Sequence, residues 1–290
     1  MKWWRGWAPL IALPVLVLLL VPSEWPRWAF MWMLTTAVFM GCKWLTWRRA
    51  AVTNVPVWKH AAYLFLWPGL DAAGFLAKGG VSNRALCRPV EWFAAAGKLA
   101  LGLVLLFGVA RLIPRQLVYI IGWTGMISVA LILHFGAFHL LSCWWRSMGV
   151  EARPLMNRPS APASLSEFWG RRWNTAFRDL TYRFLFRPFT SWFGPRWGML
   201  AGFLFSGAVH DLVISVPARG GYGGPTIFFA VQGAAMMAER SAFGRRIGLG
   251  SGWSGRVFTF LVLLVPVGLL FHRPFVEGII VPFMRALGAI

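Results

Sequence analysis

The feature that most constrains this chain is a series of long apolar blocks separated by shorter, basic stretches. Crossing the roughly 30 Å hydrocarbon core of a bilayer takes about 20 residues of helix. A chain that is 58% hydrophobic and only 13% charged also has too little polar surface to coat a soluble globule. The sequence therefore predicts an all-α, polytopic transmembrane helical bundle of about eight spans, near residues 7–22, 28–47, 90–110, 116–142, 198–217, 225–239, 256–272 and 274–290.

A ninth stretch, residues 55–70, is too short and too often interrupted to cross comfortably. It contains Pro56, Lys59, His60 and Pro68, and we interpret it as interfacial or re-entrant. The whole chain, 1–290, is then a single integral membrane domain.

The formal charge of +20 does not predict a nucleic-acid partner, because the Lys and Arg residues lie between the apolar blocks rather than in one solvated arm. Membrane orientation explains them better, and membrane lipids are the expected surroundings. With the N-terminus on the cytoplasmic side and residues 55–70 not crossing, the predicted topology places the long basic segment 143–197 on the cytoplasmic side. The arginines near residues 240–256 lie on that side as well.

Neither the cysteines nor the histidines have the spacing of a metal site. Cys42, Cys87 and Cys143 are scattered without a CxxC pair, so we expect neither a disulfide nor a cysteine metal site. His134 and His139 do not fall on one helix face, and no metal ligand is predicted. The Gly-rich stretch 219–225 opens no phosphate-binding motif and is interpreted as a flexible turn.

Segment 143–197 is too long for a simple turn, and long loops often carry function. Ser164 and Glu167 form the S-x-x-E pattern of a capping box, which predicts the start of an amphipathic helix. Glu167, Arg171, Asn174 and Arg178 would share one face of that helix. Such a helix is most simply an anchor on anionic lipid; alternatively Arg171, Arg172 and Arg178 bind the phosphates of a cytosolic substrate.

His210 lies about a dozen residues into the predicted span 198–217, and Asp211 follows it. Ionisable residues are costly at membrane depth, so they usually face a bundle interior or a wet cavity. A lone histidine in an apolar helix is most often a hydrogen-bonded core residue, but imidazole is also the best general base near neutral pH. Ser206 lies one turn earlier and could orient His210.

At the motif level the chain resembles the membrane-bound O-acyltransferases, and within them the wax synthase-like branch. The run Phe168–Asn174 resembles the family's FWGRRWN motif, and Ser206–Asp211 resembles its S-G-x-x-H element followed by an acidic residue. Asp211 stands where Glu is common. Further likeness covers most of the chain, through Phe177-Arg178-Asp179, Phe186-Arg187-Pro188, His134-Phe135-Gly136, Trp67-Pro68-Gly69 and Glu239-Arg240.

The resemblance implies transfer of a fatty acyl group from acyl-CoA to the hydroxyl of a lipidic acceptor, a long-chain alcohol in wax ester synthesis. It implies His210 as the catalytic base and Asn174 as its companion, which would donate to the thioester carbonyl or the oxyanion. Substrate binding is expected from Arg171, Arg172, Trp173, Arg178, Ser206 and Asp211. Acyl-CoA is a co-substrate, and neither a metal nor another cofactor is expected.

Other functions remain open from the sequence. The acceptor could instead be a sterol, diacylglycerol, lipid-linked sugar or polysaccharide, because cavity shape decides that choice. A transporter would need polar residues spread through several spans, and the candidates are Lys98, Gln232 and His210. A structural scaffold would need none of this chemistry. The richness in Arg, Gly, Ala and Trp suggests a bacterial protein of the cytoplasmic membrane.

Overall fold

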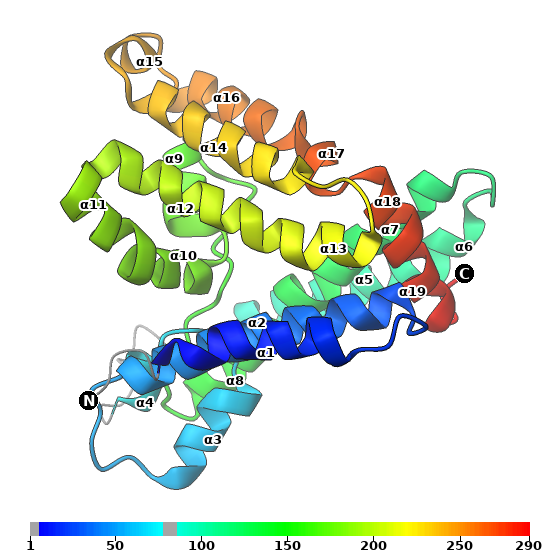
Figure 1. Cartoon of the computed structure of the whole chain (residues 1–290), viewed down its shortest axis with the longest axis horizontal. Coiled ribbons are helices and arrows are strands. Elements are labelled where there is room, and N and C mark those ends of the chain that lie inside the picture. Colours follow the sequence, from blue (N-terminus) through cyan, green and yellow to red (C-terminus); the bar gives the residue numbers. More distant parts are fainter. Residues whose placement is uncertain (1–5, 78–85) are drawn as a thin grey trace. The chain divides into compact units, whose positions relative to one another are not determined.

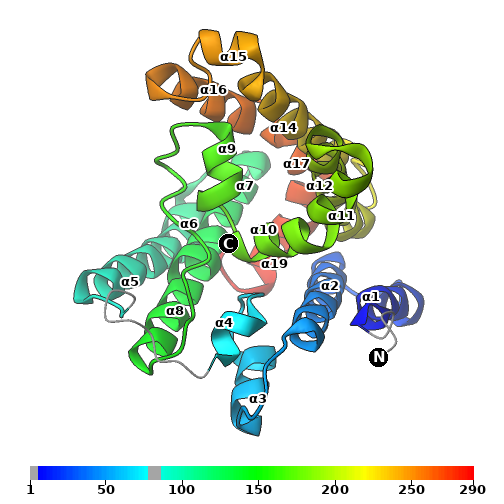
Figure 2. The same ribbon diagram turned by 90° about the vertical axis from the view of Figure 1, so that its left-hand side faces the viewer.

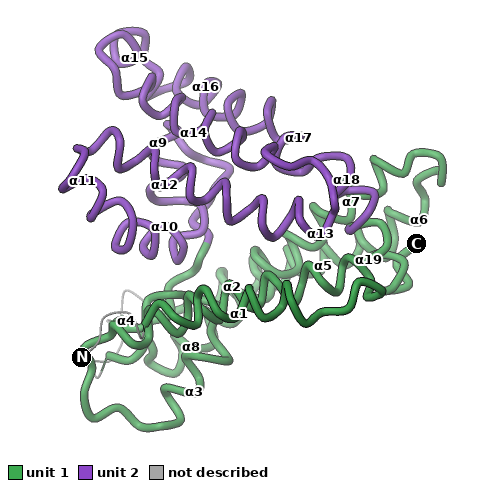
Figure 3. Tube along the Cα trace, in the orientation of Figure 1, with its two compact units in different colours: residues 1–155, 280–290 green, residues 156–279 purple. Residues whose placement is uncertain are grey.

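The computed structural model describes residues 6–77 and 86–290, and every regular element in these two ranges is helical. The all-α prediction is therefore confirmed for this part of the chain. The helices divide into two compact units, one made of residues 1–155 with 280–290 and the other of residues 156–279 (Figure 3). The organisation of 1–290 as a single domain stays a prediction.

Within residues 6–77 and 86–290, four continuous helices are long and apolar enough to cross a membrane, by length and composition. They are Pro89–Leu112, Val118–Ser147, Pro195–Ala218 and Gly252–Leu270, and they match four of the predicted blocks. The remaining blocks form the 13-residue helix α1 (Ala8–Leu20), the 23-residue α2 (Arg27–Arg49), the 17-residue α14 (Gly224–Arg240) and a C-terminal run of short helices. The count of about eight spans stays a prediction.

The first unit contains two helical hairpins (Figures 1 and 2). One pairs α1 with α2; the other pairs α5 (Pro89–Val104) with the helix that runs through α7 (Val118–Ala130), η4 (Leu131–Ala137) and α8 (Phe138–Ser147). Between α5 and α7 the chain continues through η3 (Leu105–Val109) and α6 (Ala110–Leu112). The unit also holds α19 (Val281–Ala286).

The predicted non-crossing stretch 55–70 forms α3 (Val57–Leu66), whose 10 residues span only about 15 Å. Its end is held by Lys43, which is fully buried and donates through Nζ to the carbonyls of Trp67 at 2.8 Å and Gly69 at 2.7 Å. The short helix α4 (Ala72–Leu76) follows. The prediction that this stretch is too short to cross is confirmed.

The prediction that the cysteines form no disulfide is wrong. Cys87, just before α5, is bonded to Cys143 in α8, with 5.1 Å between the Cα atoms. The antiparallel packing of α5 on α8 brings residues 56 apart in sequence to the same end of one hairpin, and linear spacing does not reveal this. Glu91 completes the group of three potential metal ligands found among residues 6–77 and 86–290. It includes none of the predicted site residues, and its sulfurs are bonded to each other.

The second unit is arranged around α12 (Pro195–His210) and α14, which run side by side. Their backbones approach closely at Gly207, where an added Cβ would lie 2.6 Å from the Cα of Thr226. From α12 the helix continues through the wide π-helical turn η7 (Asp211–Ser215) and α13 (Val216–Ala218). The rest of the unit consists of α15 (Ala242–Arg246), α16 (Gly252–Leu264), α17 (Val267–Leu270), α18 (Arg273–Phe275) and η8 (Val276–Ile280), whose last residue belongs to the first unit.

The segment before α12 is helical but interrupted. It comprises α9 (Leu165–Glu167), η5 (Phe168–Arg172), α10 (Thr175–Thr181), η6 (Tyr182–Phe186) and α11 (Arg187–Phe193). The turn into α12 is made by Gly194, with φ 82°, followed by Pro195 at the first position of the new helix.

Candidate active site

The FWGRRWN segment begins at the capping box that the sequence predicts. Ser164 Oγ accepts from the N–H of Glu167 at 3.0 Å, and the Glu167 carboxylate accepts from the N–H of Ala163 at 2.6 Å. That backbone N–H and the guanidinium of Arg172, 2.7 Å away, hold the pKa of Glu167 below its usual value. The carboxylate of Glu239, on α14, accepts from the N–H of Leu165 at 2.6 Å and secures the same helix start.

The prediction that one continuous amphipathic helix follows the capping box at Ser164 is wrong. Trp173 is extended, with φ −99° and ψ 126°, and Asn174 is left-handed, with φ 39° and ψ 63°. The ring of Trp173 stacks on that of Phe168 with 5.5 Å between centroids, and the chain bends at Asn174 before α10 begins. Glu167 and Arg171 therefore lie on one segment and Arg178 on the next, with Asn174 at the bend between them.

Two of the three predicted phosphate-binding arginines are engaged within the protein. Arg172 donates to the carbonyl of Arg158 at 3.0 Å in addition to pairing with Glu167. Arg178 donates to the carbonyl of Gly170 at 2.7 Å and pairs with Asp179 at 2.6 Å. Arg171 is exposed and makes no hydrogen bond or ion pair within the described part of the chain. The substrate-binding roles of all three, and of Trp173, stay predictions.

His210 is the last residue of α12, directly before the wide turn η7. Its Nδ1 lies 2.6 Å from the carbonyl oxygen of Ser206, and its ring lies 4.6 Å from the ring of Phe229. A carbonyl oxygen only accepts, so Nδ1 carries the proton and the lone pair is on Nε2. Ser206 thus orients His210 through its backbone carbonyl rather than through its hydroxyl.

The carboxylate of Asp211 is hydrogen-bonded to other groups of the protein. Its Oδ1 accepts from Ser215 Oγ at 2.8 Å and from the N–H of Gly223 at 2.9 Å, while Oδ2 accepts from the N–H and hydroxyl of Thr226. A carboxylate offers about four acceptor sites, and four donors occupy them. Asp211 thereby anchors the Gly-rich turn 219–225 and the start of α14; contact with a substrate stays a prediction.

Aromatic side chains connect the FWGRRWN segment with His210. Trp169 packs on Phe203 and Phe229, each with 5.7 Å between ring centroids, and Phe229 contacts His210. The indole N–H of Trp169 donates to Gln232 Oε1 at 3.3 Å, and Gln232 Nε2 donates to the carbonyl of Val262 at 2.9 Å. Motif reasoning missed Phe229 altogether, because a phenylalanine in an apolar helix has no sequence signal of its own.

Asn174 lies in the same unit as His210, at the bend before α10. Its backbone N–H donates to the sulfur of Met156 at 3.3 Å, and its side chain makes no hydrogen bond within residues 86–290. The amide is therefore unengaged by the protein, as a donor for a substrate must be. No contact joins it to His210 in the described residues, and their partnership stays a prediction.

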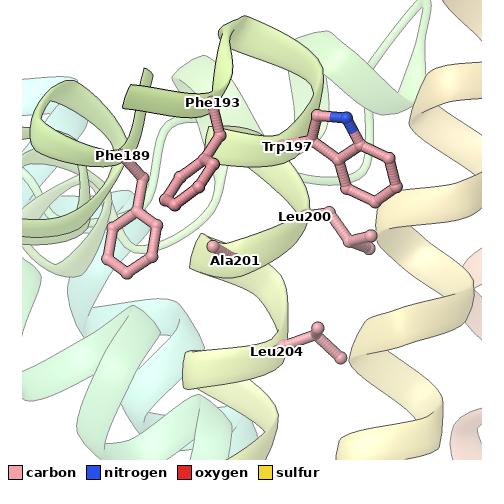
Figure 4. A pocket seen from close by; sticks show the side chains of 6 residues that line it. All are labelled: Phe189, Phe193, Trp197, Leu200, Ala201 and Leu204. Atoms are coloured by element: carbon pink, nitrogen blue, oxygen red, sulfur yellow. The ribbon is translucent and has the colours of Figure 1, made fainter. Parts of the chain in front are cut away.

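A groove between α11 and α12 is lined almost entirely by apolar atoms (Figure 4). Phe189 and Phe193 come from α11, and the opposite side is formed along α12 by Trp197, Leu200, Ala201 and Leu204. Leu204 is six residues before His210, a rise of about 9 Å along the helix. The lining suits an alkyl chain, and the indole N–H of Trp197 is the one polar side-chain group among the six residues that form it.

The long apolar helices among the described residues, one of which contains His210, indicate a helical integral membrane protein. Residues 152–231 match the model of the "Membrane bound O-acyl transferase family". Among curated relatives, Probable long-chain-alcohol O-fatty-acyltransferase 3 of Arabidopsis thaliana is 29% identical over 60% of this chain and 58% of its own length. Probable long-chain-alcohol O-fatty-acyltransferase 7 of the same plant is 31% identical over 45% and 42%.

Long-chain-alcohol O-fatty-acyltransferase of Simmondsia chinensis is 35% identical over 23% of this chain and 21% of its own length. The chain thus spans less than two thirds of the length of the curated relatives that it matches. The chain is thus similar to the membrane-bound O-acyltransferase family over residues 152–231, and the curated relatives it matches are long-chain-alcohol O-fatty-acyltransferases.

Proposed function

We propose that this chain is an acyl-CoA-dependent O-acyltransferase that transfers a fatty acyl group to a long-chain alcohol and forms a wax ester. The observation that carries the proposal is the tautomer of His210: Nδ1 is committed to the Ser206 carbonyl, which leaves a basic lone pair on Nε2. The names of the relatives, which are long-chain-alcohol O-fatty-acyltransferases, support the alcohol as acceptor.

In the proposed reaction, Nε2 of His210 takes the hydroxyl proton as the alcohol oxygen attacks the thioester carbonyl. The carbon–sulfur bond then breaks, and the protonated imidazole returns the proton to the departing thiolate, which leaves as free CoA. Asn174, whose amide is unengaged, would donate to the developing oxyanion. The apolar groove of Figure 4 suits one of the two alkyl chains.

Arg171 is our choice for the CoA phosphates, because its guanidinium is exposed and has no ion pair among residues 6–77 and 86–290, whereas Arg172 and Arg178 hold the fold of the segment. On the predicted topology this segment is cytoplasmic, where CoA is available. We expect no metal or redox cofactor, since thioester and hydroxyl already contain the electrons that the transfer requires. A bacterial cytoplasmic membrane is the location that the composition favours.

The experiment that tests the proposal is ester formation by the detergent-purified protein from palmitoyl-CoA and hexadecanol, with the product identified by mass spectrometry. We expect alcohol-dependent ester that falls by about 10² to 10⁴ in His210→Ala, the usual contribution of a general base. His60→Ala, in the separate helix α3, is the matched control and should keep the activity of the unaltered chain.

Each other outcome has a definite meaning. Ester formed only with a sterol, diacylglycerol or lipid-linked sugar replaces the acceptor and keeps the reaction. Equal rates in His210→Ala and the unaltered chain remove His210 as the base. No transfer to any hydroxyl overturns the proposal and leaves a transporter or scaffold; the engagement of both Gln232 amide atoms weighs against a polar transport path there.

A further inference from the structure

We propose that His272 is a positioning residue for His210, acting through Ser215, Asp211 and the start of α14; this inference rests on the proposed acyl transfer. His272 precedes α18, is 62 positions from His210 and belongs to none of the motifs. Its side chain is almost fully buried, at 8% exposure, and Ser215 beside it is completely buried.

The hydrogen bonds of His272 show which of its ring nitrogens donates and which accepts. The N–H of Phe275 donates to Nδ1 at 3.2 Å, so Nδ1 is the acceptor and Nε2 carries the proton. Nε2 lies 3.1 Å from Ser215 Oγ and donates to it, and Ser215 Oγ donates in turn to Asp211 Oδ1 at 2.8 Å. The chain of donors thus ends on the carboxylate that directly follows His210.

Asp211 connects these hydrogen bonds to the residues around His210. Its other partners are the N–H of Gly223 and the N–H and hydroxyl of Thr226, so it sets the position of the first turn of α14 against α12. Phe229, one turn further along α14, is the side chain whose ring lies 4.6 Å from that of His210. A shift of the first turn would move this ring and release the imidazole.

The Gly-rich turn is shaped around the same histidine. A Cβ on Gly221, which has φ 72°, would lie 2.2 Å from Cγ of His272, so the ring lies directly against the backbone of this turn. The network contains Ser, His and Asp but is not a hydrolytic triad. Asp211 binds the serine rather than Nδ1 of His272, and Ser215 is enclosed with no access to a substrate.

Two substitutions of His272 separate positioning from simple support. His272→Asn keeps an oxygen near Nδ1, where it can accept from Phe275 and cap α18, but it does not reach Ser215. His272→Gln places an amide donor near Nε2, within reach of Ser215, but loses the cap. We compare kcat and KM for ester formation with the thermal unfolding midpoint of each purified variant.

The positioning role predicts that kcat follows the bond to Ser215. His272→Asn should lose roughly tenfold to a hundredfold in kcat at unchanged KM, as misplacement of a catalytic group does. His272→Gln should recover most of kcat although its midpoint is lower. If kcat in the two variants instead follows their midpoints, or is unchanged in His272→Asn, the inference is overturned. Absence of ester from the unaltered chain would contradict the proposed function itself, which is a different result.

Discussion

At the residue scale, the site is defined by which polar groups the protein uses for itself. His210 has one ring nitrogen committed and one free, whereas all acceptor positions of Asp211 are occupied. Arg172 and Arg178 are bound to backbone carbonyls and carboxylates, but Arg171 is not. The side chains predicted from the sequence to bind substrate therefore divide into two sets. Some are hydrogen-bonded within the protein and stabilise its fold, and others have a polar group available to a substrate.

This division predicts a specific effect of Arg171→Ala. An exposed guanidinium gains little from one phosphate, so we expect KM for palmitoyl-CoA to rise roughly threefold to tenfold with kcat nearly unchanged. The measurement is ester formation with palmitoyl-CoA and with palmitoyl-pantetheine, which lacks the phosphates. Arg115→Ala, exposed in the loop between the predicted spans 90–110 and 116–142, is the control. An equal loss with both thioesters would show that Arg171 does not meet the phosphates.

At the element scale, the FWGRRWN segment is shaped by its two ends. The capping box and Glu239 secure its start, and the stacking of Trp173 on Phe168 with the left-handed Asn174 ends it. A single helix over these residues would place the unengaged amide of Asn174 in one row with Arg171 and Arg178. The bend separates the amide from that row.

The pKa of Glu167 makes the start of this segment sensitive to acid. Because the folded-state pKa is lowered, the ionised carboxylate stabilises the fold above the ordinary glutamate pKa of about 4.3, and this contribution is lost as the pH falls through the folded value. Glu167→Gln should reduce the free energy of unfolding at pH 7 by less than about 1 kcal/mol, and the thermal unfolding midpoint should fall accordingly. The gap should close below the folded-state pKa, as thermal unfolding in detergent can measure. A gap independent of pH would contradict this account.

At the scale of the whole molecule, two compact units carry different features. Residues 156–279 contain the FWGRRWN segment, His210, the groove and the His272 network, while the first unit contains the disulfide and the buried Lys43. The disulfide also bears on topology, since it requires Cys87 and Cys143 to be on the same side of the membrane. The predicted spans 90–110 and 116–142 place them so.

The disulfide predicts a redox effect on the stability of the first unit. In the chain-entropy account, a cross-link between residues 56 apart restrains the unfolded chain by about 4 kcal/mol. Cys87→Ser should lower the unfolding midpoint of the oxidised protein, and dithiothreitol should bring the unaltered chain to the same value. Cys42→Ser serves as the thiol control that leaves the response to reductant intact. No response of the unaltered chain to reductant would exclude the bond in the purified protein.

The helical class, the presence of membrane-spanning helices and the similarity to membrane-bound O-acyltransferases follow from the amino-acid sequence alone. The length of an apolar block and the spacing of a motif are local properties, so they can be determined without knowing which residues are in contact. The capping box at Ser164 and the short helix at 57–66 followed from the same local chemistry. The folded structure was needed to show which arginines are engaged within the protein, which histidine contacts Ser215, and that Cys87 is bonded to Cys143. Those facts depend on pairs of residues far apart in the chain, and a linear pattern contains no information on which distant partner a polar group will find.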